Sequence, residues 1–294
     1  MKRIRSDSAF TVIELLLAAT ITVVLAGIMI SVSLTALRIW RKSQDDFTVD
    51  TTASLILDFL ERDLQGAIFR SDGNTWLRCE TFDSELVAHG WKIPRSNFLK
   101  PVLAQAQESG SARSIAQATF SRSGHWLRFF TTTGGEPIAV GYQIVRRSFS
   151  GASTPDPETM RYAFFRRTVK SETTFAIGYD ITAYNDLISP ESTYNAGSNV
   201  IDFGIWFYRA GAGGTLSPIM GATVEVRNSS MPIAADVMVR ILTEEGATLI
   251  SSMERELVQV PAEFEGDRDR WWWSVAEKYS RVYVRRVLIG SAIP

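Results

Sequence analysis

The apolar positions of the first forty residues form one unbroken run. From Leu15 to Leu37 the chain has no charged residue over 23 positions, and 17 of these are apolar. An α-helix rises about 1.5 Å per residue, so about 20 residues cross the roughly 30 Å hydrocarbon core of a bilayer. The run is therefore long enough to span a membrane once. The sequence holds no second run of this kind, so a single-pass protein is predicted.

Beyond this run the composition becomes polar, but apolar residues return at intervals of three and four. They are Ala53, Ile56, Leu57, Leu60, Leu64, Ala67 and Ile68. Such spacing marks one face of an amphipathic helix. Because only Gly27 interrupts residues 10–65, the pattern predicts one helix of about 55–60 residues that ends near Gly66 or Gly73. Two helices with a bend near Gln44 are the alternative.

The rest of the chain has the pattern of β-structure. Six stretches are rich in Val, Ile, Phe and Tyr and are bounded by turn residues, which predicts strands. They are residues 125–130, 138–147, 160–169, 200–208, 236–242 and 281–289. Gly134-Gly135 predicts a hairpin turn between the first two. Antiparallel pairing is expected because no helical patterns alternate with the strands. Residues 148–159 and 209–222 are predicted surface loops, and 92–118 a loop or a short helix.

Composition narrows the function classes. The net charge of −1 lacks the basic excess that is typical of nucleic-acid binders. Cys79 is the only cysteine, which excludes an internal disulfide and a Cys-rich zinc site. No phosphate-binding glycine motif, serine-hydrolase elbow or zinc-protease motif is present. His125 lies in an aromatic strand and is expected to be structural. We therefore predict no enzymatic activity, no cofactor and no nucleic-acid partner.

An acidic cluster near the C-terminal end is a weak calcium candidate. It contains Glu265, Asp267 and Asp269, and hard cations favour carboxylate oxygens. The spacing does not match an EF-hand loop. A solvated loop is therefore the favoured interpretation, and no metal site is predicted.

The run Trp271-Trp272-Trp273 is a candidate partner contact. In a strand, successive side chains point to opposite faces, so three consecutive rings cannot all enter one core. At least one ring would then lie at a loop, an interface or a membrane surface. Burial in the core with partial exposure is the favoured interpretation, and a partner contact is the alternative.

The N-terminal residues carry a more specific pattern. A short basic stretch precedes Ala9 and Phe10, and Glu14 stands just before the apolar run. This arrangement resembles the processing site of type IV prepilins and type II secretion pseudopilins. In that family a basic leader is removed before an aromatic residue, the new amino terminus is N-methylated, and a glutamate stands fifth in the mature chain. The resemblance implies a leader of residues 1–9, cleavage by prepilin peptidase between Ala9 and Phe10, and N-methylation of Phe10. The family usually has Gly before the cut, and Ala9 departs from that.

Glu14 would be the fifth residue of the mature chain. A carboxylate beside an apolar segment raises the free energy of membrane insertion, so such a residue usually has a task. In a fibre of packed helices it can neutralise the amino terminus of a neighbouring subunit, and this pairing is stronger in a low-dielectric bundle than in water. In the alternative, a plain signal anchor, Glu14 has no role and reaches the lipid headgroups.

Two further segments resemble the same family. Residues 55–65 resemble a segment of J-type minor pseudopilins and PilW-like minor pilins, and residues 199–208 resemble a strand of the former. The resemblance implies an α+β, pilin-like fold, in which a long N-terminal helix packs on an antiparallel β-sheet domain. It implies four parts. They are the leader (1–9), the membrane-spanning half of the helix (10–37), its soluble amphipathic half (38–70) and a β-rich domain (71–294).

The function implied is that of a minor subunit of a type IV pilus or type II secretion pseudopilus, with a tip or priming role. Its partners would be prepilin peptidase, other pilins or pseudopilins through the N-terminal helix, and the inner membrane. Three basic residues lie on each side of the span, so the orientation, with the C-terminal domain in the periplasm, comes from the resemblance alone. The alternative functions are a membrane-anchored binding module that enters no fibre and, less favoured, an anchored hydrolase.

Overall fold

The computed structural model describes most of the chain. The residues described are 11–69, 72–81, 87–88, 91–92, 115, 125–148, 160–185, 187–188, 195–219, 223–227 and 232–289. The chain divides into two compact units, Met1–Thr48 and Val49–Pro294. The predicted loops at 92–118 and 148–159 lie almost entirely outside the described residues.

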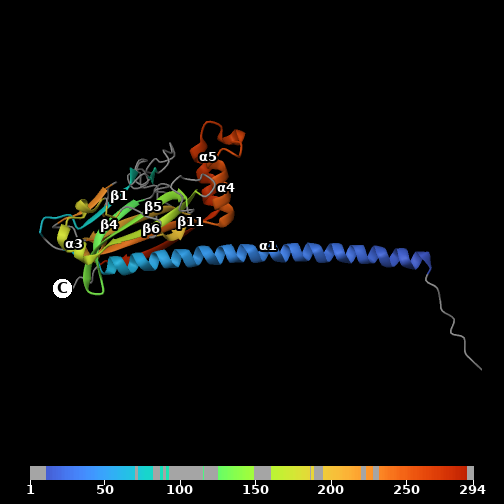
Figure 1. Cartoon of the computed structure of the whole chain (residues 1–294), viewed down its shortest axis with the longest axis horizontal. Helices are drawn as coiled ribbons and strands as arrows, with labels where there is room; N and C mark the ends of the chain where they lie inside the picture. The colour runs from blue at the N-terminus through green and yellow to red at the C-terminus, as the bar shows by residue number, and fades with distance from the viewer. Residues whose placement is uncertain are drawn as a thin grey trace, which may run out of the picture. The chain divides into compact units, whose positions relative to one another are not determined.

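The longest element is α1 (Val12–Gln65), a continuous helix of 54 residues (Figure 1). This confirms the predicted single helix, and no break occurs near Gln44. The helix ends beside Gly66, where a Cβ atom would lie only 2.8 Å from Thr131 Oγ1. The chain then runs along the adjacent strand, since Ile68 N donates to Phe130 O at 2.9 Å. Glycine is therefore required where the helix meets the sheet.

The β-structure forms two main antiparallel sheets rather than one. The six-stranded sheet has the order β10 (Thr223–Val226), β1 (Leu77–Thr81), β4 (His125–Thr133), β5 (Glu136–Ser148), β6 (Met160–Val169) and β7 (Asn195–Ser198). The four-stranded sheet has the order β12 (Ser280–Leu288), β11 (Ala234–Leu242), β8 (Val200–Ala210) and β9 (Leu216–Pro218). A separate pair is formed by β2 (Val87–Ala88) and β3 (Trp91–Lys92). All six predicted strands and their antiparallel pairing are confirmed, whereas the predicted loop 209–222 is partly wrong because it contains β9.

The predicted hairpin between β4 and β5 is confirmed. Gly134 and Gly135 have φ values of 61° and 85°, and a tight two-residue hairpin needs positive φ at both positions. Another left-handed residue, Asn199 (φ 63°), joins the two sheets. Its N–H donates to Tyr162 O on β6 at 2.7 Å, and its carbonyl accepts from Leu242 N on β11 at 2.9 Å. The chain thus passes from one sheet to the other through a single residue that is bonded to both.

Several helices were not predicted. They are α3 (Ser171–Ile177), α4 (Glu244–Glu254), α5 (Arg268–Lys278) and the 3₁₀ turns η3 (Ile181–Tyr184), η5 (Ala212–Gly214) and η6 (Ala262–Phe264). Capping residues mark three of them. Asp180 Oδ1 accepts from Thr182 N at 3.0 Å at the start of η3. Thr243 Oγ1 accepts from Gly246 N at 3.2 Å, and Asp267 Oδ1 accepts from Arg270 N at 3.0 Å. These are ordinary helix-start signals that the strand-based interpretation passed over.

The main core lies between one face of the sheets and the last five turns of α1. The helix contributes six apolar side chains that are at most 5% exposed, namely Val49, Ala53, Ile56, Leu57, Leu60 and Leu64. These include five of the seven positions from which the amphipathic face was predicted. The predicted apolar stripe is therefore the surface that the domain buries.

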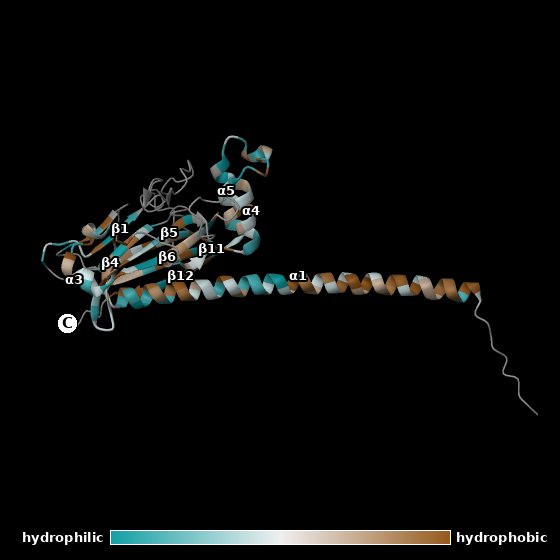
Figure 2. Cartoon of the chain, in the orientation of Figure 1, coloured by the Kyte–Doolittle hydropathy of each residue, from teal (hydrophilic) through white to brown (hydrophobic). Residues whose placement is uncertain are grey.

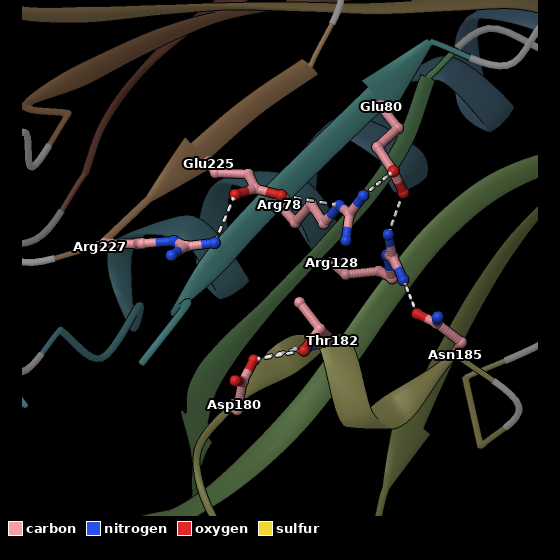
Figure 3. Close-up of polar contacts among 8 residues, drawn as sticks. All are labelled: Arg78, Glu80, Arg128, Asp180, Thr182, Asn185, Glu225 and Arg227. Carbon is pink, nitrogen blue, oxygen red and sulfur yellow. Dashed lines mark hydrogen bonds and ion pairs between the residues drawn. The ribbon is translucent and has the colours of Figure 1, made fainter. Parts of the chain in front are cut away.

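The other face of the six-stranded sheet carries a ladder of alternating charges (Figure 3). Arg128 is the last charge of the ladder. It is 1% exposed, donates to Glu80 and to Asn185, and its Cζ lies 3.6 Å from the centre of the Trp126 ring. Burial lowers the pKa of Arg128 to about 10, although Glu80 opposes this shift. The members, in order, are Arg227, Glu225, Arg78, Glu80, Arg128 and Asn185. Each charge is paired with its neighbour in the ladder, so the network ties three strands and the turn after η3 together.

A buried carboxylate, that of Asp63, fixes α1 on the sheet. Asp63 is 2% exposed and accepts hydrogen bonds from Tyr142 Oη at 2.5 Å and from Arg166 Nε and Nη2 at 2.8 and 3.0 Å. Its backbone carbonyl accepts from Thr131 Oγ1 at 2.7 Å. Burial and the adjacent Asp63 raise the pKa of Tyr142 well above its usual value. The carboxylate thus pairs closely with the Arg166 guanidinium and more distantly with that of the exposed Arg62, whose Nε lies 3.8 Å away, and each carboxylate oxygen is bonded.

Replacing Asp63 with Asn should destabilise the protein strongly. The change leaves Arg166 without its counter-ion, and breaking a buried pair costs about 3–5 kcal/mol. We expect the low end, about 3 kcal/mol, since Arg166 is 19% exposed. Urea unfolding of the full chain in detergent measures this loss in the free energy of unfolding. The control is Asp58→Asn, at an exposed position, which should stay within about 0.5 kcal/mol of wild type. Equal losses in the two variants would contradict the anchoring role.

His125 joins the two sheets from inside. It is 2% exposed, and its Nδ1 accepts the backbone N–H of Ile205 on β8 at 3.0 Å. Burial lowers the pKa of the imidazole to about 3. The histidine is therefore neutral in the folded protein and acts as an acceptor, which fits the structural role predicted for it.

Stability should fall as the solution is acidified below about pH 6.5. The pKa of His125 is about 3 in the folded protein and about 6.5 in the unfolded chain, so only the unfolded state takes up the proton between these values. In this range the residue contributes a slope of about 1.4 kcal/mol per pH unit to the free energy of unfolding. His125→Asn keeps an acceptor but cannot titrate. The variant should be less stable than wild type at pH 7. Between pH 6 and 4, its free energy of unfolding, measured with urea, should depend less on pH than that of wild type. An equal dependence on pH in both proteins would contradict a neutral, buried His125.

Candidate functional site

The candidate site is the amino end of α1 and the apolar surface that follows it. The predicted cleavage residues, Ala9 and Phe10, lie outside the described residues. Glu14 is described, and it stands in the first turn of α1. The structure thus places the predicted acidic residue at a helix start, and it leaves the cleavage itself a prediction.

Glu14 and Thr11 form a reciprocal helix cap. Glu14 Oε2 accepts from the backbone N–H of Thr11 at 2.9 Å and from its hydroxyl at 3.1 Å. In return, the N–H of Glu14 donates to Thr11 Oγ1 at 3.3 Å. This is the capping-box arrangement, in which a Thr and a Glu three residues apart satisfy two helix-start N–H groups. Glu14 therefore has a local role that needs no neighbouring subunit, and the T-x-x-E pattern that signals it was missed.

The surface beyond the cap is apolar on all sides. Every residue from Thr11 to Gln44 is exposed within the described chain, and the large apolar side chains are 47–77% exposed, from Leu37 to Ile13. Figure 2 shows the N-terminal half of α1 coloured mainly as hydrophobic. A contiguous apolar surface of this size marks a contact with lipid or protein. Among the described residues α1 is the one helix long and apolar enough to cross a membrane, so it could be a single span or a signal anchor.

The three threonine hydroxyls within this surface are satisfied by the helix itself. Thr22 Oγ1 donates to Ala18 O at 2.8 Å, Thr35 Oγ1 donates to Ser31 O at 2.9 Å, and Thr20 donates to the carbonyl four residues before it. A hydroxyl bonded in this way does not require water. These threonines therefore do not conflict with a lipid or helix-bundle environment.

The part of α1 that lies in the second unit carries an acidic outer edge, which is paired with β12. Arg285 Nη1 contacts Asp58 at 2.5 Å and Glu61 at 2.8 Å, and Tyr283 donates to Asp50. Burial and the bond to Asp50 raise the pKa of Tyr283 to about 12. These carboxylates are 36–65% exposed, and exposed pairs contribute little stability. The exposed pairs define how β12 meets the helix, whereas the buried bonds of Asp63 contribute most of the polar stabilisation of the helix on the domain.

The three tryptophans are helical, so the strand geometry assumed for them was wrong. Trp271 and Trp272 are 6% and 2% exposed on the inner face of α5. Trp272 Nε1 donates to Glu254 at 3.0 Å, and Trp273 packs edge-on against Trp272 with 4.8 Å between ring centres. Only Trp273 retains partial exposure. The rings belong to the core, which leaves little of them for the predicted partner contact.

Two members of the predicted acidic cluster, Glu265 and Asp267, have described side chains. Asp267 caps α5, since its Oδ1 accepts the N–H of Arg270 at 3.0 Å. Glu265 is exposed, and the side chain of Asp269 lies outside the description. Within the described part of the chain, no group of three or more His, Cys, Asp or Glu could hold a metal ion. Asp267 therefore has a structural role as the cap of α5.

Comparison with known proteins adds no relative. No family model, no curated protein and no solved structure matches the chain. The features described define an α+β protein with antiparallel sheets and one long apolar N-terminal helix that could span a membrane. Any narrower function has to be argued from the residues of the chain itself.

Proposed function

We propose that this chain is a minor pilin or pseudopilin subunit. It would be cut by prepilin peptidase between Ala9 and Phe10, N-methylated at Phe10, and then assembled into a type IV pilus or a type II secretion pseudopilus. The observation that carries the proposal is the spacing from Phe10 to Glu14 directly before a single apolar run, Leu15 to Leu37, whose residues are all exposed. The subunit would perform no chemistry itself.

The apolar surface of α1 suits both environments that such a subunit would meet. Before assembly the side chains from Leu15 to Leu37 would face lipid, which helps them leave water. After assembly the same side chains would pack against neighbouring helices. Thr20, Thr22 and Thr35 bond to their own helix, so neither environment leaves these hydroxyls unsatisfied.

Glu14 would change partner on assembly. In the isolated chain its carboxylate is held by Thr11, which provides hydrogen bonds but no positive charge. In a fibre, the amino terminus of a neighbouring subunit would provide that charge, and an ion pair gains strength when water is excluded. An incoming subunit that lacked the pairing would bury an uncompensated carboxylate, which is costly. The pairing would therefore favour the correct register between subunits.

The location proposed is the inner membrane, with one span and the C-terminal domain in the periplasm. The partners would be prepilin peptidase and other pilins or pseudopilins, with a tip or priming role in the fibre. A membrane-anchored binding module that enters no fibre is the second candidate. It predicts full function when residues 10–40 are replaced by an unrelated membrane anchor, whereas the fibre role predicts loss of function.

The mature amino terminus tests the processing step. Mass spectrometry of the protein purified from cells with an active prepilin peptidase should find N-methylated Phe10 as the first residue. A peptidase-deficient strain provides the control, in which residues 1–9 should remain attached. Any other amino terminus in the active strain would contradict the assignment.

Substitutions at the cap separate the charge of Glu14 from its hydrogen bonds. Glu14→Gln keeps an acceptor for the Thr11 N–H but removes the charge, so incorporation into fibres should fall at least about tenfold, as it should for Glu14→Ala. A tenfold change corresponds to about 1.4 kcal/mol. Thr11→Ala weakens the cap and keeps the charge, so it should assemble nearly normally.

The readout is the ratio of fibre-associated to membrane-associated protein in sheared cells. Total membrane-inserted protein should be equal in all variants, which controls for failed insertion. Normal assembly of Glu14→Gln would show that the cap alone suffices and would overturn the pairing argument.

A further inference from the structure

The helices α4 and α5 form a closed excursion between two paired strands. β11 and β12 are direct neighbours whose register ends at Leu242 and Ser280. The excursion begins and ends at one point, since Thr243 N donates to Tyr279 O at 2.9 Å. A Cβ at Gly246 would lie 2.6 Å from the Cβ of Tyr279, so the base is packed tightly. Residues 243–279 thus leave the sheet and return to the same place (Figure 1).

One buried carboxylate fixes this helical hairpin to the six-stranded sheet. The side chain of Glu254 is 8% exposed and pairs with Arg146 Nε at 2.7 Å. It also accepts from Tyr162 Oη at 2.5 Å and from Trp272 Nε1 at 3.0 Å. Both helices of the hairpin are therefore tied to the domain through a group with satisfied hydrogen bonds, and the hairpin is a rigid support.

The loop that joins the two helices, residues 255–267, is braced by its own backbone. Leu257 N donates to Ser252 O at 3.0 Å, and Asp267 N donates to Phe264 O at 3.0 Å. Glu256 and Arg268 form an ion pair at 2.7 Å that joins the start of the loop to the start of α5. A loop held in this way loses little conformational freedom when another molecule binds it.

The exposed apolar residues of the excursion lie in this loop. Leu257 is 64% exposed and Val258 is 37% exposed. The residue before them, Glu256, has φ 59°, a left-handed conformation that is sterically unfavourable for a residue with a side chain. This residue ends α4 in a Schellman motif, because Glu256 N donates to Met253 O at 3.1 Å and Leu257 N donates to Ser252 O at 3.0 Å. The motif leaves the Leu257 side chain exposed to solvent.

The charge around the apolar pair limits what can bind there. Residues 255–267 contain four acids and one base, a net charge of −3, against −1 for the whole chain. Glu256 is paired and Asp267 caps α5, whereas Glu263 and Glu265 are exposed in the same loop. An acidic surface is repelled by anionic lipid headgroups and by nucleic-acid phosphates. A protein surface with apolar and basic side chains is complementary to it.

We propose that the loop 255–267 is a docking site for a second protein that presents a basic, apolar surface, with Leu257 and Val258 as the contact centre. A small apolar centre within a charged rim is the usual anatomy of a protein interface. The buried tryptophans support the loop rather than contact the partner. The docking site does not depend on the fibre role, because it also suits an anchored binding module.

Site-specific photocrosslinking in the cells that produce the protein tests this docking site. The photoreactive residue p-benzoylphenylalanine replaces Val258 in one full-length chain and Ser274, an exposed residue of α5, in a matched control. We expect a crosslinked protein from position 258 and none from position 274. The crosslinked peptide of that protein, identified by mass spectrometry, should lie on a basic surface.

Charge reversal in the same experiment tests the recognition chemistry. The double variant Glu263→Lys, Glu265→Lys and the single variant Leu257→Ser should each reduce the adduct at position 258 at least fivefold. The exposed Glu277→Lys should leave it unchanged, and thermal unfolding should show that each variant is folded.

Three results would overturn the proposal. The first is an equal yield of adduct at positions 258 and 274, or no adduct at either. The second is an adduct at position 258 that the Glu263→Lys, Glu265→Lys variant does not reduce. The third is an adduct formed with lipid or with a second copy of this chain. If a variant fails to fold, the comparison of positions 258 and 274 still decides the location. Processing at Phe10 can succeed while this test fails, so the two proposals are separable.

Discussion

The carboxylate of Asp63 determines how the long helix is held by the domain. The apolar contacts of Leu60 and Leu64 favour burial but tolerate small rotations, and the pairs at Asp58 and Glu61 are exposed and weak. The bonds from Tyr142 and Arg166 are directional and buried. They allow one rotation of the helix about its axis, and that rotation selects the stripe of α1 that enters the core. The register of Gly66 against Thr131 follows from it.

Local signals were sufficient to predict the elements but not their arrangement. The predicted strand 160–169 coincides with β6, because its aromatic and β-branched residues end at turn residues. The division into two sheets depends on Asn199, which bonds β6 and β11 at once. Those strands are far apart in sequence, so no pattern within either could show it. The tryptophan run was assigned the period of a strand, whereas the cap at Asp267 begins a helix and places Trp271 and Trp272 on its inner face.

The candidate site shows a similar limit, because one carboxylate fits two roles. The distance from Phe10 to Glu14 pointed to pairing with a neighbouring amino terminus, while the shorter pattern from Thr11 to Glu14 pointed to a helix cap. The cap is seen in the structure, and the pairing stays a prediction. Both roles use the same oxygens but differ in charge, since a cap needs only acceptors and a pair needs an anion. The amide of glutamine distinguishes them for that reason.

The chain exposes apolar side chains in two physically different ways. Along α1 they surround the helix from Leu15 to Leu37 with no charge among them, which suits a continuous environment such as lipid or a bundle of like helices. At Leu257 and Val258 they form a small patch on a braced loop that also carries the exposed Glu263 and Glu265. A charged rim would be costly in lipid and is useful only against a surface of opposite charge. The first surface therefore favours an environment, whereas the second favours a specific protein partner.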